Sequence, residues 1–261
     1  MGAIRGLFSF FTMLRLDIDE TDMQKMNEKF HLVPLIGLFY GLILGVGIFI
    51  LQQFVETLLA VATVFFLIQI INRFLHLDGL MDVGDGLTVS GTREDHLRAL
   101  KDTHIGAGGV AFAFLITLIS FSGLASVPDL WVPFVPLVVE IFSRNAMLAA
   151  AAFGQPGSGM AGESVRLTGL GSLAKSIFIS LVLAISVSGF IWYVFQHHGL
   201  SVPPTQISII ALGLAVLSST MLGWFMAHTA HRNFGIVNGD MLGATNEIAR
   251  AILLILILVV I

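Results

Sequence analysis

The amino-acid sequence predicts an all-α integral membrane protein with about seven transmembrane helices and an N-terminal helix that lies in the membrane interface. Hydrophobic residues make up 56% of the 261 residues and charged residues only 11%, and the mean hydropathy is +0.92. Soluble domains carry about 25% charged residues, so this chain has too little polar surface to cover a soluble core. Because no Pro/Ser-rich linker divides it, we expect a single membrane domain over residues 1–261.

Seven apolar stretches are long enough, or nearly long enough, to cross a bilayer, which takes about 20 residues. They are Pro34–Leu51, Thr57–Ile71, Ala107–Val127, Trp131–Phe153, Leu173–Phe195, Ile207–Ala227 and Ile248–Ile261. The second is short unless it continues through Phe74 toward Leu80, and the last is also short. The apolar run Ala3–Leu16, with Arg5 and Arg15 near its ends, is too short to span, so it is the predicted interfacial helix.

The basic residues predict the orientation of these spans. All 13 Lys and Arg residues lie before the first span or around the loops that follow the second, fourth and sixth spans, and the other three loops contain none. Cytoplasmic loops are enriched in Lys and Arg. We therefore expect a multi-pass protein of the cell membrane whose N-terminus is cytoplasmic, with residues 1–33 cytoplasmic or interfacial, and whose C-terminus is outside.

Other features narrow the class of protein and the packing of the bundle. The chain has no cysteine and a net charge of −4, so thiol nucleophiles, disulfides and iron–sulfur sites are excluded and a nucleic-acid partner is not expected. Gly37, Gly41 and Gly45 recur at every fourth position of the first span. A stripe of small residues at this spacing predicts close packing against another helix.

The segment Asn72–Leu87 reads NRFLHLDGLMDVGDGL and has the strongest functional pattern. Asp78, Asp82 and Asp85 are spaced by four and three residues, so a helix would place their side chains on one face. Like charges at this spacing disfavour a helix unless a cation lies between them. Carboxylate ligands without sulfur indicate Mg²⁺, with Mn²⁺ as a second choice. The alternative is a solvated acidic loop, but the apolar residues between the aspartates favour a metal site.

The charged segment that follows, Arg93–Gly109, adds further candidates and extends the predicted catalytic region over residues 72–106. Asp102 could complete the metal site, and Lys101 or His104 could hold a phosphate oxygen. The alternative is a solvated helix whose charges have no function, and we prefer it for Glu94.

In the fourth span, Glu140 and Arg144 lie one helical turn apart, with Asn145 beside them. An ion pair inside a membrane compensates its own charges, so a structural and a functional role both stay open. The loop Gly154–Gly171 is either a lid over a phosphate group or a plain flexible loop.

Polar residues also lead into the last span. Asp240, Gly243 and Glu247 fall on one side of a helix at this spacing. Capping of that helix explains Asn238 or Asp240, but it explains Glu247 less well. The chain contains no G-x-S-x-G, P-loop or H-E-x-x-H motif. This favours phosphoryl-group chemistry by a metal and bound substrates, without a covalent enzyme intermediate.

Three segments resemble the signatures of the cobalamin synthase family, also called adenosylcobinamide-GDP ribazoletransferase: HLDGLMDVGDGL at 76–87, KDTHIGAGG at 101–109 and NGDMLGATNEI at 238–248. The resemblance spans most of the chain. It implies transfer of adenosylcobinamide phosphate from adenosylcobinamide-GDP to α-ribazole or its 5′-phosphate. The implied products are adenosylcobalamin, or its 5′-phosphate, and GMP. It further implies a need for Mg²⁺ and allows contacts with other corrinoid-assembly enzymes, while the oligomeric state stays open.

The residues and the resemblance together give a predicted site. Asp78, Asp82, Asp85 and Asp102 are the predicted metal ligands. Asp82, Asp85 or His104 would accept the proton of the attacking ribose hydroxyl. The predicted substrate-binding residues are His76, Arg93, Lys101, Arg144, Asn145, Asp240 and Glu247.

Two other classes of protein share some of these features. CDP-alcohol phosphotransferases begin their motif with D-x-x-D-G, as in Asp82–Gly86, but their final D-x-x-x-D is absent here and Asp102 is the one candidate aspartate downstream. Transporters usually bind substrate near the membrane midplane between two repeated halves. Here the aspartates are expected at the cytoplasmic end, and no internal repeat is evident.

Overall fold

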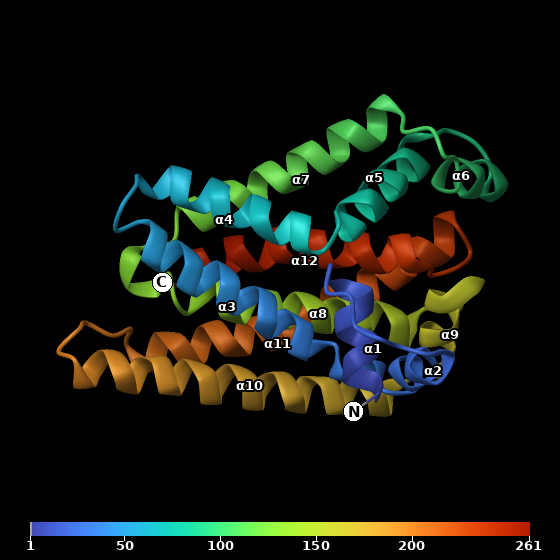
Figure 1. Cartoon of the computed structure of the whole chain (residues 1–261). Coiled ribbons are helices and arrows are strands. Elements are labelled where there is room, and N and C mark those ends of the chain that lie inside the picture. Colours follow the sequence, from blue (N-terminus) through green and yellow to red (C-terminus); the bar gives the residue numbers. More distant parts are fainter. Residues whose placement is uncertain (1) are drawn as a thin grey trace.

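The protein forms a bundle of long helices, with shorter helices gathered at one end (Figure 1). The computed structural model describes residues 2–261. Six helices in this part of the chain are long and apolar enough to cross a membrane, which confirms the predicted all-α membrane fold. They are α3 (Pro34–Leu51), α7 (Ala107–Ala125), α8 (Val135–Phe153), α10 (Leu170–His197), α11 (Thr205–Asn233) and α12 (Gly239–Leu258). The predicted number of seven is reached if α4 and α5 together form one broken span.

The break between α4 (Thr57–Ile71) and α5 (Leu75–Thr88) bends the chain by 88°. The helical chain therefore does run on past Phe74 to Leu80, but around a sharp bend. The reason lies in the backbone of Arg73 and Phe74, which have φ angles of 57° and 56°. This left-handed conformation is uncommon for residues other than glycine and interrupts a right-handed helix. Arg73 Nη2 donates a hydrogen bond to the carbonyl oxygen of Phe10 at 2.7 Å, which ties the break to the N-terminal segment.

The last helix is longer than predicted, because α12 begins at Gly239 and not at Ile248. Asn238 caps it by accepting a hydrogen bond from the Met241 N–H at 3.1 Å, as expected from the sequence. The polar residues of its first half are buried inside the bundle. Arg250 lies within α12 and is fully buried, so its assignment to the last loop is wrong. Buried Arg250 and Arg144 therefore carry no information about orientation.

Helix α8 is the centre of the bundle and is buried along almost its whole length. It packs against α3, α10, α11 and α12. The contact with α3 uses the predicted glycine stripe. A Cβ atom at Gly41 would lie 2.7 Å from the Cα of Leu137, and one at Gly45 would lie 3.0 Å from the carbonyl oxygen of Pro133. The stripe lets two backbones touch, as the spacing predicts.

We expect Gly41→Ala to lower the thermal unfolding temperature of the detergent-purified protein clearly, because the added methyl group meets backbone on α8 that cannot move aside. Overpacking of this kind costs about 1–3 kcal/mol. Gly213 in α11 is the matched control, since a Cβ atom there meets nothing within 4 Å. Gly213→Ala should be neutral or slightly stabilising, as alanine favours helices. Equal effects of the two changes would contradict the proposed packing.

The remaining helices gather mainly at the end of the bundle where α3 and α10 begin (Figure 1). The apolar N-terminal run forms α1, which ends at Phe11 and does not reach the predicted Leu16. Tyr40 in α3 holds this end by donating a hydrogen bond from its hydroxyl to the carbonyl oxygen of Phe11 at 2.5 Å. The loop Gly154–Gly171 contains a helix, and Ser164 within it donates to Asn27 Oδ1 at 2.7 Å. The short helices are α1 (Gly2–Phe11), α2 (Glu20–Glu28), η1 (Phe30–Leu32), α6 (Arg93–Leu100), η2 (Asp129–Trp131) and α9 (Gly159–Leu167).

Candidate active site

The predicted aspartate face is present on α5. Residues Leu75–Thr88 form a regular α-helix, so Asp78, Asp82 and Asp85 lie on one side of it. Asp78 is exposed, whereas Asp82 and Asp85 are partly buried. The opposite side packs into the bundle through Leu80 and Val83, which are fully buried. Burial of this apolar side explains how α5 stays helical despite three like charges on its other side.

Helices α5 and α12 cross with their backbones in contact. A Cβ atom at Gly79 would lie 2.7 Å from the Cα of Asp240, and one at Gly243 would lie 3.1 Å from the Cα of His76. This crossing brings Asp240 to the aspartates of α5. Asp240, Asp78 and Asp85 are the charged groups that act on Asp82. Asp240, predicted as a substrate-binding residue, therefore belongs to the carboxylate cluster itself.

The donor set of this cluster fits a hard divalent cation. No salt bridge within residues 2–261 involves Asp78, Asp82 or Asp240, so no positive charge compensates their mutual repulsion there, although Asn238 Nδ2 donates a hydrogen bond to Asp240 Oδ2 at 2.6 Å. Nor does this part of the chain bring three His, Asp or Glu groups around one point where they could hold a metal. Magnesium is usually held by one or two carboxylates, with water and substrate phosphates as its other ligands. The cluster therefore fits Mg²⁺ bound together with a phosphorylated substrate.

Asp85 has partners that the sequence did not reveal. Its two carboxylate oxygens accept hydrogen bonds from the backbone N–H groups of Gly106 and Gly109, at 2.6 and 2.7 Å. These groups belong to the start of α7, where the helix dipole favours a negative charge. Glycine is required close by, because a Cβ atom at Gly109 would lie 2.6 Å from an Asp85 oxygen. Asp85 thus holds the start of α7 against α5, and its predicted metal-binding and catalytic roles stay predictions.

Lys101, Asp102 and His104 lie exposed in the connection between α6 and α7. Asp102 accepts a hydrogen bond from the backbone N–H of His104 at 2.9 Å and lies 3.0 Å from its ring Nδ1. The backbone N–H holds the pKa of Asp102 below its ordinary value. Asp102 is not among the charges that act on Asp82. The structure therefore does not bring Asp102 to the other predicted metal ligands.

Arg93 begins α6 and reaches the turn that precedes α12. A Cβ atom at Gly235 would lie 3.3 Å from the Arg93 side chain. The solvated-helix interpretation of its neighbours fits the structure. Glu94 is exposed, and Asp95 forms a capping box with Thr92 at the start of α6. Hydrogen bonds from Thr92 lower the pKa of Asp95.

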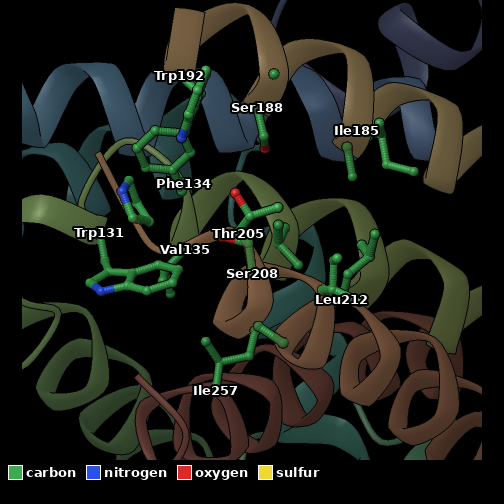
Figure 2. A pocket seen from close by; sticks show the side chains of 16 residues that line it. Trp131, Phe134, Val135, Ile185, Ser188, Trp192, Thr205, Ser208, Leu212 and Ile257 are labelled. Carbon is green, nitrogen blue, oxygen red and sulfur yellow. The ribbon is translucent and has the colours of Figure 1, made fainter. Parts of the chain in front are cut away.

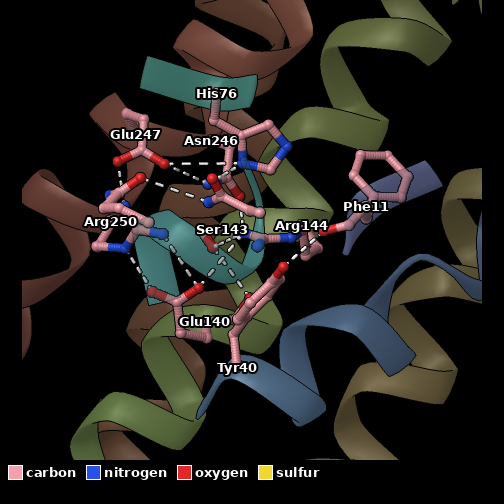
Figure 3. A network of polar contacts seen from close by, with 11 residues as sticks. Phe11, Tyr40, His76, Glu140, Ser143, Arg144, Asn246, Glu247 and Arg250 are labelled. Atoms are coloured by element: carbon pink, nitrogen blue, oxygen red, sulfur yellow. Dashed lines mark hydrogen bonds and ion pairs between the residues drawn. The ribbon is translucent and has the colours of Figure 1, made fainter. Parts of the chain in front are cut away.

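Behind the carboxylates lies a buried network of charges (Figure 3). Glu140 binds Arg250, with Arg250 Nη2 3.3 Å from Glu140 Oε2 and a shorter contact from Nε, and Arg144 Nη1 lies 3.4 Å from the same Oε2. Arg250 also pairs with Glu247. The predicted pair of Glu140 and Arg144 is thus one part of a four-charge network that joins α8 to α12. Two carboxylates and two guanidinium groups balance, as buried charges must.

Asn246 connects this network to His76 of α5. Arg144 donates to Asn246 Oδ1, while Asn246 Nδ2 lies 3.1 Å from Glu247 Oε1 and 3.2 Å from His76 Nδ1. Three predicted substrate-binding residues, His76, Arg144 and Glu247, therefore meet. Asn145 does not join them, because Ser176 and Ser180 of α10 bind both ends of its amide at 2.5 and 2.7 Å.

A cavity of about 90 Å³ links His76 to the carboxylate cluster. It lies among α1, α2, α5, α9 and α12, and both Asp78 and Asp240 line it. A larger cavity of about 380 Å³ lies among α8, α10, α11 and α12 (Figure 2). Trp131, Phe134, Trp192 and other apolar side chains line that cavity, which has no titratable lining residue. Of these two cavities, only the smaller one has carboxylates in its lining.

The fold and the site together define a multi-pass membrane protein with a carboxylate cluster at one end of its helical bundle. The model of a family described as cobalamin-5-phosphate synthase matches residues 3–258. The chain therefore belongs to this family of transferases in cobalamin synthesis, as the three sequence segments predict.

Curated relatives agree with the family match over almost the whole chain. A protein of Methanocella arvoryzae named adenosylcobinamide-GDP ribazoletransferase is 34% identical over 256 residues, covering 96% of this chain and 92% of its own. Proteins with the same name from Methanosarcina mazei and Clostridium perfringens are 28% and 26% identical. They cover 98% and 92% of this chain, and in each case 91% of the relative. No solved structure matches the chain.

Proposed function

We propose that the protein transfers adenosylcobinamide phosphate from adenosylcobinamide-GDP to α-ribazole or α-ribazole 5′-phosphate. A ribose hydroxyl oxygen forms a bond to the phosphorus attached to cobinamide, the bond from that phosphorus to the bridging oxygen breaks, and GMP leaves with the electron pair. The main support is the carboxylate cluster, in which α5 carries Asp78 and Asp82 and its close crossing with α12 at Gly79 brings Asp240 beside them. The names of the relatives supply the substrates.

One or two carboxylates from the set Asp78, Asp82 and Asp240 would hold Mg²⁺, or Mn²⁺ in its place, with substrate phosphates and water as the other ligands. When bound, the ion would neutralise charge on the pyrophosphate as it is cleaved. Arg93, beside the turn that leads into α12, is placed to attract the phosphate groups toward the cluster. Repulsion among the aspartates costs stability in the free protein, and phosphate-bound metal relieves it.

Asp82 is the best placed of the three predicted proton acceptors. Both oxygens of Asp85 already accept backbone hydrogen bonds, and His104 is exposed beside Asp102. Asp82 takes no hydrogen bond from the described residues 2–261, and it is partly buried among the other carboxylates. We assign the proton of the attacking hydroxyl to it.

The carboxylate end of the bundle is assigned to the cytoplasmic face of the cell membrane. Arg144 and Arg250 are buried and Arg73 lies at the break between α4 and α5, but the other Lys and Arg residues lie in or beside segments at this end. The excess of basic residues on one side supports this orientation.

Release of GMP tests the proposed function. Purified protein in lipid vesicles should release GMP from adenosylcobinamide-GDP when α-ribazole and Mg²⁺ are both present, and not when either is left out. GMP release at the same rate without α-ribazole would show hydrolysis and contradict the proposal. CMP release from CDP-diacylglycerol would favour a CDP-alcohol phosphotransferase, and substrate flux without turnover would favour a transporter.

A further inference from the structure

His76 presents an unused hydrogen-bonding group to the smaller cavity. The residue is 2% exposed, it lines the cavity, and its Nε2 atom is buried with no hydrogen-bond partner. Figure 3 shows this nitrogen on the side of the ring that faces Phe11, away from Glu247. An unpaired polar atom in a buried site costs free energy unless a ligand supplies the missing partner.

The buried network determines which ring nitrogen of His76 carries hydrogen. Arginine has only donors and an ionised glutamate only acceptors. Arg144 donates a hydrogen bond to Asn246 Oδ1, and Glu247 Oε1 accepts one from Asn246 Nδ2 at 3.1 Å. Both contacts therefore identify the same end of the Asn246 amide as the oxygen and the same end as the nitrogen. The Asn246 NH₂ group therefore donates to His76 Nδ1 at 3.2 Å.

The alternative is that His76 Nδ1 carries hydrogen and donates to Glu247 Oε1. That distance is 3.7 Å, which is too long for a hydrogen bond. Hence Nδ1 is the acceptor and Nε2 carries the hydrogen. The network holds His76 as a hydrogen-bond donor directed into the cavity, and the ligand must supply an acceptor atom.

The rest of the cavity indicates what kind of ligand carries this acceptor. Its walls are aromatic, aliphatic and thioether side chains, which suit the faces of a planar ring. They include Phe10, Phe11, Met26, Phe30, Leu75 and Met147. Asp78 and Asp240 also line the cavity, and they are its two carboxylate groups.

We propose that this cavity binds the planar heteroaromatic base of the nucleoside acceptor, and that His76 Nε2–H donates a hydrogen bond to an unsubstituted ring nitrogen of that base. The inference rests on the proposed function, because it takes the acceptor to be a nucleoside. The sugar then extends toward Asp78 and Asp240, where its hydroxyl oxygen forms the bond to phosphorus. His76 is thus a specificity residue, and Arg144, Asn246 and Glu247 position it.

The size of the cavity sets one condition. A cavity of about 150 Å³ accommodates benzene, so a space of about 90 Å³ takes a bicyclic base only when its rim moves. Met160 on α9 lines the cavity, is 45% exposed and has an unbranched side chain, so a change of its rotamer would widen the opening.

The test compares benzimidazole with indole, which has the same shape but a C–H group in place of the acceptor nitrogen. Binding of each to the detergent-purified full chain is measured by calorimetric titration. Wild-type protein should bind benzimidazole at least about tenfold more tightly than indole, since the donor is left unpaired by indole. His76→Phe keeps a ring in place but removes the donor, so the two affinities should become equal.

Ala161→Phe is the second variant, because Ala161 lines the cavity from α9 and forms no hydrogen bond or ion pair through its side chain. It should weaken the binding of both bases equally. If His76→Phe does not fold, this variant still tests whether the bases bind in the cavity. Equal affinities in the wild type, a preference that persists in His76→Phe, or unchanged binding in Ala161→Phe would each overturn the proposal. The titrations contain no nucleotide and no metal, so their failure is distinct from a failure to release GMP.

Discussion

Asp82→Asn should reduce GMP release by at least about 100-fold and leave the protein folded. The charge that Asp82 offers to a metal and the proton acceptor that we assign to it are both lost, and each such effect is worth several kcal/mol at about 1.4 kcal/mol per tenfold in rate. Asp82 also repels Asp240 and Asp78 in the free protein. The variant should therefore unfold at the same temperature as wild type or slightly higher. Release of GMP by chromatography and thermal unfolding measure the two effects.

A second variant in the cluster and a control variant outside it test the same assignment. Asp240→Asn should cause a loss of similar size, because Asp240 belongs to the same carboxylate cluster as Asp82. Glu94→Gln is the control, since Glu94 is exposed on α6 and has no role in the site. Near-normal turnover in Asp82→Asn, or an equal loss in Glu94→Gln, would contradict the assignment of the carboxylate cluster.

Arg250→Met should destabilise the bundle strongly. The change leaves two carboxylates, Glu140 and Glu247, with only the charge of Arg144 beside them, and all are fully buried or nearly so. Removal of one partner from a buried ion pair costs about 3–5 kcal/mol. Thermal unfolding in detergent should show a large drop in unfolding temperature, or the protein should fail to accumulate in membranes.

The double variant Glu140→Gln/Arg250→Met tests whether charge balance is the cause. It restores neutrality, so it should be more stable than Arg250→Met alone. Arg166→Met is the control at the surface, where the pair with Glu163 is exposed on both sides and is worth about 0–1 kcal/mol. If Arg166→Met lowered the unfolding temperature as much as Arg250→Met, the loss of charge balance in the buried network would not explain the effect.

The sequence predicts those features that depend on local spacing. Apolar length gives the bounds of α3 and α4, and the spacing of Asp78, Asp82 and Asp85 gives a shared face on a helix that the structure confirms. The spacing of Gly37, Gly41 and Gly45 predicts a close helix contact, which is the contact of α3 with α8. Helical periodicity alone carries this information.

Features that depend on distant partners could not be predicted. Glu140 and Arg250 are 110 positions apart in the chain, so the sequence does not show that Arg250 has a buried carboxylate partner. Asp240, Asn246 and Glu247 lower the hydropathy of the first half of α12, which explains the late predicted start of that span. The break at Arg73 and Phe74 contains no glycine or proline, so it gives no local signal. The partnership of Asp240 with Asp82 depends on the crossing of α5 and α12, although its helical spacing with Gly243 is visible in the sequence.

We propose that Asp82 contributes an oxygen to a metal ion during transfer. The chain has no cysteine, so Asp82→Cys introduces a single thiol, which prefers the soft ion Cd²⁺ over Mg²⁺. The measurement is the ratio of GMP-release rates in Cd²⁺ and in Mg²⁺, for the variant and for wild type. We predict that Asp82→Cys is inactive in Mg²⁺ and regains activity in Cd²⁺, with a ratio at least about tenfold above that of wild type. A ratio equal to that of wild type would contradict metal binding by this residue.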